Sequence, residues 1–85
     1  MSLIKVEVLT SAALEVRRGL FFHGPTWDGD VPSKVGRDQL VRLGLAERYE
    51  GYQWLTRDGV EGAINDGLAQ AKDEYWRARA ARERR

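Results

Sequence analysis

A β-hairpin signal near the middle of the chain constrains the fold most strongly. Two short runs rich in aromatic and aliphatic residues flank Glu50-Gly51. Because glycine readily adopts the positive φ of a tight turn, this pattern predicts an antiparallel hairpin over residues 45–56 with a two-residue loop. The expected cross-strand neighbours are Tyr49 with Tyr52 and Glu47 with Trp54 on one face, and Arg48 with Gln53 and Ala46 with Leu55 on the other.

Two helices are predicted before the hairpin. Ser11 is the expected N-cap of a first helix that ends near Phe22, along which apolar residues recur at helical spacing. Ser33 is the expected N-cap of a second helix that runs to about Leu43 and stops at Gly44. The second helix is expected to turn Leu40, Leu43 and either Val35 or Gln39 toward the core, and Lys34, Arg37, Asp38 and Arg42 outward.

A last helix is predicted after the hairpin. Thr56 is its expected N-cap, and apolar residues from Val60 to Ala78 follow one another as a single stripe. Trp76 lies off this stripe. Glycine costs about 1 kcal/mol relative to alanine in a helix interior, so we expect the stretch around Gly67 to bend or interrupt the helix.

The remaining segments are short. Residues 4–8 alternate apolar and charged side chains, which favours a strand with one buried face, although Leu9 could equally begin a helix. Residues 23–33 contain both prolines of the chain and two glycines. This composition predicts a loop with turns, with room for one short extended piece, and we expect Trp27 to hold it to the core.

Length and composition indicate one globular domain, residues 1–85. A chain of 85 residues with 42% hydrophobic residues can form one core but not two. The absence of cysteine excludes disulfides and thiolate metal sites and favours a reducing compartment, so we expect a cytoplasmic protein. Lys5 and Glu7 interrupt the apolar N-terminal stretch, which argues against a signal peptide or a membrane span.

Positive charge is concentrated at the C-terminal end. The chain has 14 basic and 13 acidic residues, and this net charge of +1 does not by itself indicate a polyanion partner. Residues 72–85 hold six of the basic residues and three of the acidic ones. We therefore expect a basic helical extension at about 72–85, although cations near a helix C-terminus are also favoured by its dipole without any ligand.

The run PSKVGRDQLVRLGLAERYEGYQWLTRDG, residues 32–59, resembles the recognition helix and wing of winged-helix proteins. The shared features are a helix ending in Leu-Gly-Leu, a hairpin that follows it directly, and a closing Leu-Thr with a glycine soon after. The resemblance implies an α+β, winged helix-turn-helix-like fold with about three helices and a small antiparallel sheet. Residues 23–32 leave little room for the extra helix of a standard winged helix. The whole chain also resembles small proteins of Mu-like prophages.

The winged-helix resemblance implies non-enzymatic DNA binding in transcription regulation. In that docking mode the second helix enters the major groove and the wing lies beside it. An ordinary solvated helix face would show a similar mixture of charges, so this alternative remains open. The residues that would contact duplex DNA are Ser33, Lys34, Arg37, Gln39, Arg42 and Arg48.

A protein-interaction or assembly module is the alternative function. Its binding surface would be the aromatic face of the wing or the C-terminal helix, and the partner would be another protein or a second copy of the chain. The near-neutral net charge is consistent with this alternative. The residues that would contact the partner are Tyr49, Tyr52 and Trp54 of the wing and Trp76 of the C-terminal helix.

The sequence contains no recognisable catalytic or metal-binding motif. The single histidine, His23, precedes Gly-Pro and is expected in a turn rather than as a general base or a metal ligand. Asp28 and Asp30 flank Gly29 but lack the further ligands of a calcium loop. We therefore expect no enzymatic activity, no cofactor and no metal.

Overall fold

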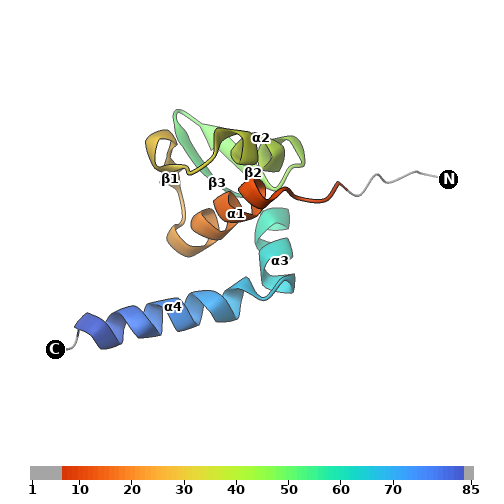
Figure 1. Ribbon diagram of the computed structural model, residues 1–85. Coiled ribbons are helices and arrows are strands. Elements are labelled where there is room, and N and C mark those ends of the chain that lie inside the picture. Colours follow the sequence, from red (N-terminus) through yellow and green to blue (C-terminus); the bar gives the residue numbers. More distant parts are fainter. Residues whose placement is uncertain (1–6, 84–85) are drawn as a thin grey trace.

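The computed structural model of the chain describes residues 7–83, which form four α-helices and a three-stranded antiparallel sheet (Figure 1). In chain order these elements are α1 Ser11–His23, β1 Thr26–Trp27, α2 Lys34–Arg42, β2 Ala46–Tyr49, β3 Tyr52–Leu55, α3 Arg57–Asn65 and α4 Leu68–Glu83. A 3₁₀ turn, Asp28–Asp30, lies between β1 and α2. The fold is α+β, with one helix more than the sequence predicts.

Hydroxyl side chains cap the starts of three helices. Ser33 caps α2 and Thr56 caps α3, as predicted. At α1 the prediction is wrong by one residue, because Thr10 rather than Ser11 is the cap. Its Oγ1 accepts a hydrogen bond from the backbone N–H of Ala13 at 3.1 Å. Each cap satisfies a helix N–H that has no partner within the helix.

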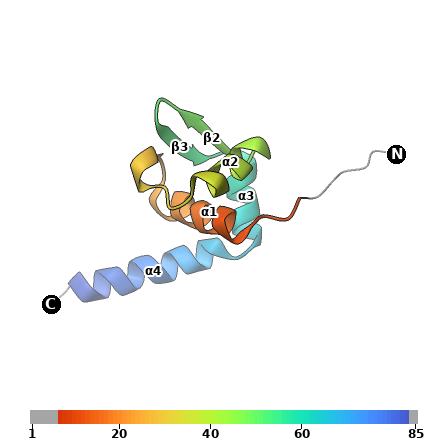
Figure 2. The same cartoon turned by 45° about the horizontal axis from the view of Figure 1, so that its top comes forward.

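Gly67 divides the predicted last helix into α3 and α4, so the expected interruption is confirmed. Its φ of +86° lies outside the helical region and is one that glycine adopts without strain. The expected apolar stripe is therefore not continuous, since Ala63 is fully buried whereas Ile64 is 49% exposed. α4 extends along one side of the molecule and past the rest of it (Figure 2), and none of its residues is buried.

The sheet has the order β1-β3-β2, and the predicted hairpin register is confirmed at all four pairs. Glu50 and Gly51 form the two-residue turn, with φ of 49° and 84°. β1 is the short extended piece expected within the loop. It pairs with the other side of β3, so that Thr26 lies opposite Gln53 and Trp27 opposite Tyr52.

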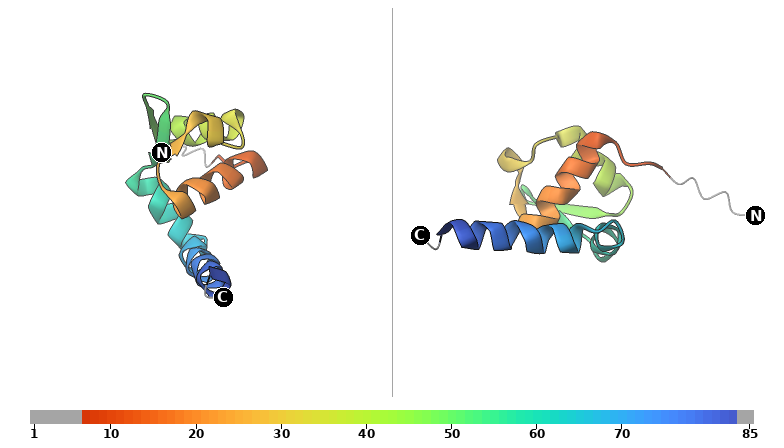
Figure 3. Two further views of the ribbon diagram at one scale, coloured as in Figure 1. Left: turned by 90° about the vertical axis from the view of Figure 1, so that its left-hand side faces the viewer. Right: turned by 60° about the horizontal axis from the view of Figure 1, so that its bottom comes forward.

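The core lies where α1 and α2 pack on the same side of the sheet (Figure 3, left). Its buried apolar members are Ala13, Val16, Leu20, Val31, Leu40 and Ala46. Trp27 is not among them, contrary to expectation, because β1 pairs with β3 so that Trp27 lies on the face of the exposed Tyr52 rather than on that of the buried Gln53. Its indole is 49% exposed and lies over the hairpin turn, where a Cβ added at Gly51 would come within 2.3 Å of the ring.

The two ends of the chain lie partly outside the described residues. Residues 4–6 of the predicted N-terminal strand lie outside the described residues. Glu7 and Val8, its last two residues, have no regular secondary structure. Arg84 and Arg85 of the basic extension are also outside. Within residues 7–83 no helix is both long and apolar enough to cross a lipid bilayer.

Candidate interaction surfaces

Arg37 packs between α2 and the sheet rather than facing outward. It is only 8% exposed. Its Nη1 donates hydrogen bonds to Oδ1 of Asp28 at 3.1 Å and to Oε1 of Gln53 at 3.3 Å. Its Nε and Nη2 both donate to Oδ1 of Asp38, at 3.0 and 2.9 Å. The expectation that Arg37 faces outward is wrong, because partners distant in the sequence compensate the burial of its charge.

Gln39 is also buried, at 8% exposure. Its Oε1 accepts hydrogen bonds from the backbone N and from Oγ1 of Thr10, at 3.0 and 3.1 Å. Its Nε2 donates to the carbonyl oxygen of Val8 at 3.2 Å. The side chain therefore ties the segment before α1 to α2. Of the two inward-facing alternatives, α2 uses Gln39, and Val35 is 76% exposed.

Asp28 is the acceptor at the centre of a network that the sequence does not indicate. Arg48 donates to both of its carboxylate oxygens, at 3.0 and 2.6 Å, Arg37 donates to one of them, and the ammonium of Lys34 donates to its carbonyl oxygen. The hydrogen bonds from Arg48 hold the pKa of Asp28 below its ordinary value, and the positive charges of Arg48, Arg37 and Lys34 act in the same direction.

The arginines that the sequence predicts as DNA contacts on α2 and the β2–β3 hairpin are all paired with carboxylates. Ser33 serves there as a helix cap, and Arg42 forms a two-pronged ion pair with Glu7 at 2.8 and 3.0 Å. The hydrogen bonds that Arg42 donates to Glu7 raise the pKa of Arg42. Arg37 pairs with Asp28 and Asp38, and Arg48 pairs with Asp28.

Three aromatic side chains form a row across the whole sheet. Trp27 of β1 lies opposite Tyr52 of β3, which lies opposite Tyr49 of β2. Directly opposed residues of neighbouring strands project from the same face. The exposed fractions are 49% for Trp27, 49% for Tyr52 and 68% for Tyr49, and the rings of Trp27 and Tyr52 are 5.2 Å apart. We call these three residues the aromatic row.

Two glutamates border the aromatic row. Glu47 accepts a hydrogen bond from Nε1 of the half-buried Trp54 at 3.1 Å, and Glu50 stands in the turn at the tip of the hairpin. Among residues 7–83 neither glutamate forms an ion pair. The aromatic row, Trp54, Glu47 and Glu50 together make up the outer sheet face, which is both aromatic and acidic.

Comparison with models of known protein families, with curated proteins and with solved structures finds no match to this chain. The function must therefore be inferred from the residues themselves.

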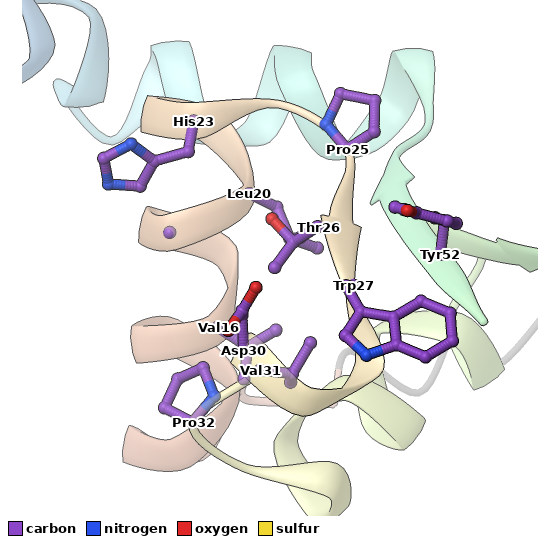
Figure 4. Close-up of a pocket in the computed structure, with 11 residues that line it drawn as sticks. Val16, Leu20, His23, Pro25, Thr26, Trp27, Asp30, Val31, Pro32 and Tyr52 are labelled. Atoms are coloured by element: carbon purple, nitrogen blue, oxygen red, sulfur yellow. The ribbon is translucent and has the colours of Figure 1, made fainter.

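An open groove of about 470 Å³ adjoins the aromatic row (Figure 4). Val16 and Leu20 of α1 form one wall, and the segment from Pro25 to Pro32 forms the other. Trp27 and Tyr52 belong to both the groove and the row. The volume is in the range of small-ligand sites, and the apolar lining suits an aliphatic side chain. In the described part of the chain no group of three or more His, Asp or Glu residues could hold a metal ion.

Trp76 is part of an aromatic cluster that attaches α4 to the end of α1. Tyr75 lies 5.4 Å from Phe22 and 5.3 Å from Trp76, measured between ring centroids, and Trp76 lies 6.3 Å from His23. Trp76 remains 40% exposed, and the guanidinium of Arg79 lies over its ring at 5.1 Å. The expectation that His23 lies in a turn is wrong, because α1 continues through His23 and ends at Gly24, whose φ is 77°.

Proposed function

We propose that this chain is a non-enzymatic protein-interaction module whose outer sheet face binds a basic segment of a protein partner. The observation that carries the proposal is the aromatic row, whose three members cross all three strands and are each about half exposed or more. Exposed aromatic side chains gathered on one face are typical of binding surfaces, because burying them on a partner gives a large hydrophobic gain.

The chemistry of the partner follows from the charges beside the row. Arginine side chains stack on aromatic rings and pair with carboxylates, and the outer sheet face offers both at once. Glu47 and Glu50 would be repelled by the phosphates of a nucleic acid. The adjoining groove could receive an aliphatic side chain next to the basic residues of the partner.

A winged-helix-like layout is part of the proposal. α2 leads directly into the β2–β3 hairpin, and the hairpin leads directly into α3, as in the family that residues 32–59 resemble. The 3₁₀ turn Asp28–Asp30 stands where a standard winged helix has a separate helix that braces the recognition helix on DNA. Because this turn is too short to brace α2 on DNA, we propose that the sheet, not α2, contacts the partner.

Fluorescence anisotropy of a labelled hexa-arginine peptide tests the proposal. The double variant Tyr49→Thr/Tyr52→Thr removes two rings but keeps residues suited to strands. Val35→Thr is the control, because Val35 is 76% exposed and lies on α2, which is not part of the outer sheet face. Each ring–guanidinium contact contributes about 0.5–1 kcal/mol, so the double variant should bind about five- to thirtyfold more weakly. Absence of binding to the wild type, or equal affinity in the double variant, refutes the proposal.

Regulatory binding of duplex DNA is the second candidate function. It is favoured by the order of elements, because α2 is followed directly by the hairpin, as a recognition helix is followed by a wing. Titration of random duplex DNA at two salt concentrations tests it, since each phosphate contact adds about one unit to the salt slope of the affinity. The variant Lys34→Gln/Arg42→Gln removes two exposed cations of α2 without touching the outer sheet face. Salt-dependent binding that this variant weakens supports DNA binding; a wild type that does not bind at low salt excludes it.

A further inference from the structure

The C-terminal part of α4 is a helical segment that is exposed along its whole length. Residues 77–83, which we call the tail, are all exposed, and they follow the Tyr75–Trp76 contact with α1. Ion pairs one turn apart support the helix locally, between Arg77 and Asp73 at 3.1 Å and between Arg79 and Glu83 at 3.2 Å. The tail therefore presents a helical surface without being packed on the body.

The tail is basic and has no large apolar side chain. The tail contains three arginines, three alanines and one glutamate, and Arg84 and Arg85 follow it in the sequence. A helix of this composition cannot form an apolar seam with an identical helix, because alanine offers little surface to bury. It can, however, place guanidinium groups on aromatic rings. The chain already uses this contact twice, with Arg79 over Trp76 at 5.1 Å and Arg18 over Phe22 at 4.6 Å.

The outer sheet face and the tail are complementary but lie apart within one molecule. In Figures 1 and 2 the hairpin is at the top of the molecule and α4 at the bottom, with α1 and α3 between them. A contact between the two surfaces therefore requires two copies of the chain.

We infer that the tail of one copy binds the outer sheet face of a second copy, so that copies associate head to tail. This inference rests on the proposed function and names the basic partner. Arg77, Arg79 and Arg82 supply the cations, and Tyr49, Tyr52 and Glu50 supply the rings and charge that receive them. The contact joins two different surfaces, so it is heterologous and generates open chains or closed rings, of which a reciprocal pair of two copies is the smallest.

Sedimentation velocity over a range of protein concentrations tests the inference. One short helix covers a small surface, which places the contact among weak interactions. We expect the wild type to associate into dimers or larger species at about 0.01 M salt. Association should be lost at about 1 M salt, because the Debye length falls between these conditions from about 30 to about 3 Å.

Two full-length variants make the test specific. The tail variant, Arg77→Gln/Arg79→Gln/Arg82→Gln, removes charge but keeps good helix formers. The face variant is Tyr49→Thr/Tyr52→Thr. Each variant alone should remain monomeric, whereas an equimolar mixture should form a one-to-one dimer and nothing larger, since only one functional tail and one functional face remain. Arg57→Gln on α3 is the control and should associate like the wild type.

The outcomes separate this inference from the proposed function. A wild type that stays monomeric at low salt, or variants that do not form the mixed dimer, overturn head-to-tail association. Dimers that persist in the tail and face variants would indicate a two-fold contact elsewhere, and they overturn it as well. Binding of hexa-arginine in either case leaves the proposed function in place, with a different protein as the partner.

Discussion

At the scale of single residues, Asp28 joins the loop after α1 to both α2 and the hairpin. It accepts hydrogen bonds from Arg37 and Arg48, and Arg37 continues the network to Gln53, whose Nε2 donates to the carbonyl oxygen of Thr26. One carboxylate therefore holds together three segments that are distant in the sequence: the loop after α1, α2 and the hairpin. Charged groups placed in this way stabilise the fold only while both partners keep their charge.

The contribution of the Asp28 carboxylate to stability should depend on pH. Arg48 holds the pKa of Asp28 below its ordinary value in the folded protein, so the ionised form contributes stability above roughly pH 4, which is lost as the pH falls through the lower folded value. We expect the melting temperature of the wild type to fall between about pH 5 and pH 3 more steeply than that of Asp28→Asn. Asp30→Asn, which lies outside the network, is the control for the circular-dichroism melts. Parallel curves for the wild type and Asp28→Asn would contradict the assignment.

Two glycines of α3 should respond oppositely to alanine. A Cβ at Gly59 would lie 1.9 Å from the carbonyl oxygen of Leu45, whereas a Cβ at Gly62 would meet nothing closer than Arg17 at 3.9 Å. Gly59→Ala should therefore lower the free energy of unfolding by about 2 kcal/mol or more through overpacking. Gly62→Ala should raise it by up to about 1 kcal/mol, because alanine is the better helix former. Urea unfolding of both variants measures the difference, and equal shifts would show that α3 is not packed on Leu45.

At the scale of elements, the turn of the hairpin is not optimal for folding. Glu50 has a φ of 49°, a conformation that asparagine adopts more readily than glutamate. Glu50→Asn should raise the free energy of unfolding by about 0.5–1 kcal/mol and should also weaken hexa-arginine binding, since it removes one carboxylate of the outer sheet face.

Gly51→Ala should destabilise the protein, because its φ is 84° and a Cβ there would meet the ring of Trp27.

Urea unfolding and the peptide titration, run on the same Glu50→Asn sample, give both results. A variant that is more stable yet binds hexa-arginine as tightly as the wild type would show that Glu50 takes no part in recognition. A variant that is less stable would contradict the turn assignment.

Features that depend on local rules follow from the sequence more fully than features that depend on distant partners. The hairpin register follows from one two-residue turn, so all four pairs could be stated from the sequence. The break between α3 and α4 follows from Gly67. The burial of Arg37 depends on Asp28 and Gln53, and the choice of Gln39 over Val35 depends on Thr10; helical periodicity cannot identify these partners.

The aromatic row was predicted in part for the same reason. Tyr49 and Tyr52 belong to the hairpin and could be placed opposite each other from the sequence. Trp27 joins them only because β1 pairs with β3, across a sequence separation of more than twenty residues. A polar or aromatic residue in a loop rich in glycine and proline gives no local signal of the strand that it will meet.

At the scale of the whole molecule, α4 gives the protein its length and separates its charges. The net charge of +1 conceals an acidic, aromatic face at the hairpin and a basic tail on the opposite side of the body. Such a distribution favours association between copies in a preferred orientation, more strongly at low salt. The direction of α4 is therefore as important to the inferred assembly as the arginines that it carries.

The packing of Tyr75 should decide whether α4 persists. An isolated helix of about 15 residues is marginal in water, and the ion pairs along α4 add only a few tenths of a kcal/mol each. Tyr75→Ala removes the ring that lies 5.4 Å from Phe22 and should reduce the helical circular-dichroism signal by up to roughly a third, the share of α4 among the helical residues. Tyr75→Phe keeps the ring and should keep the signal. If helicity is lost in Tyr75→Ala, head-to-tail association should be lost at the same protein concentration. If helicity survives, the tail is helical without the contact to α1, and association should survive as well.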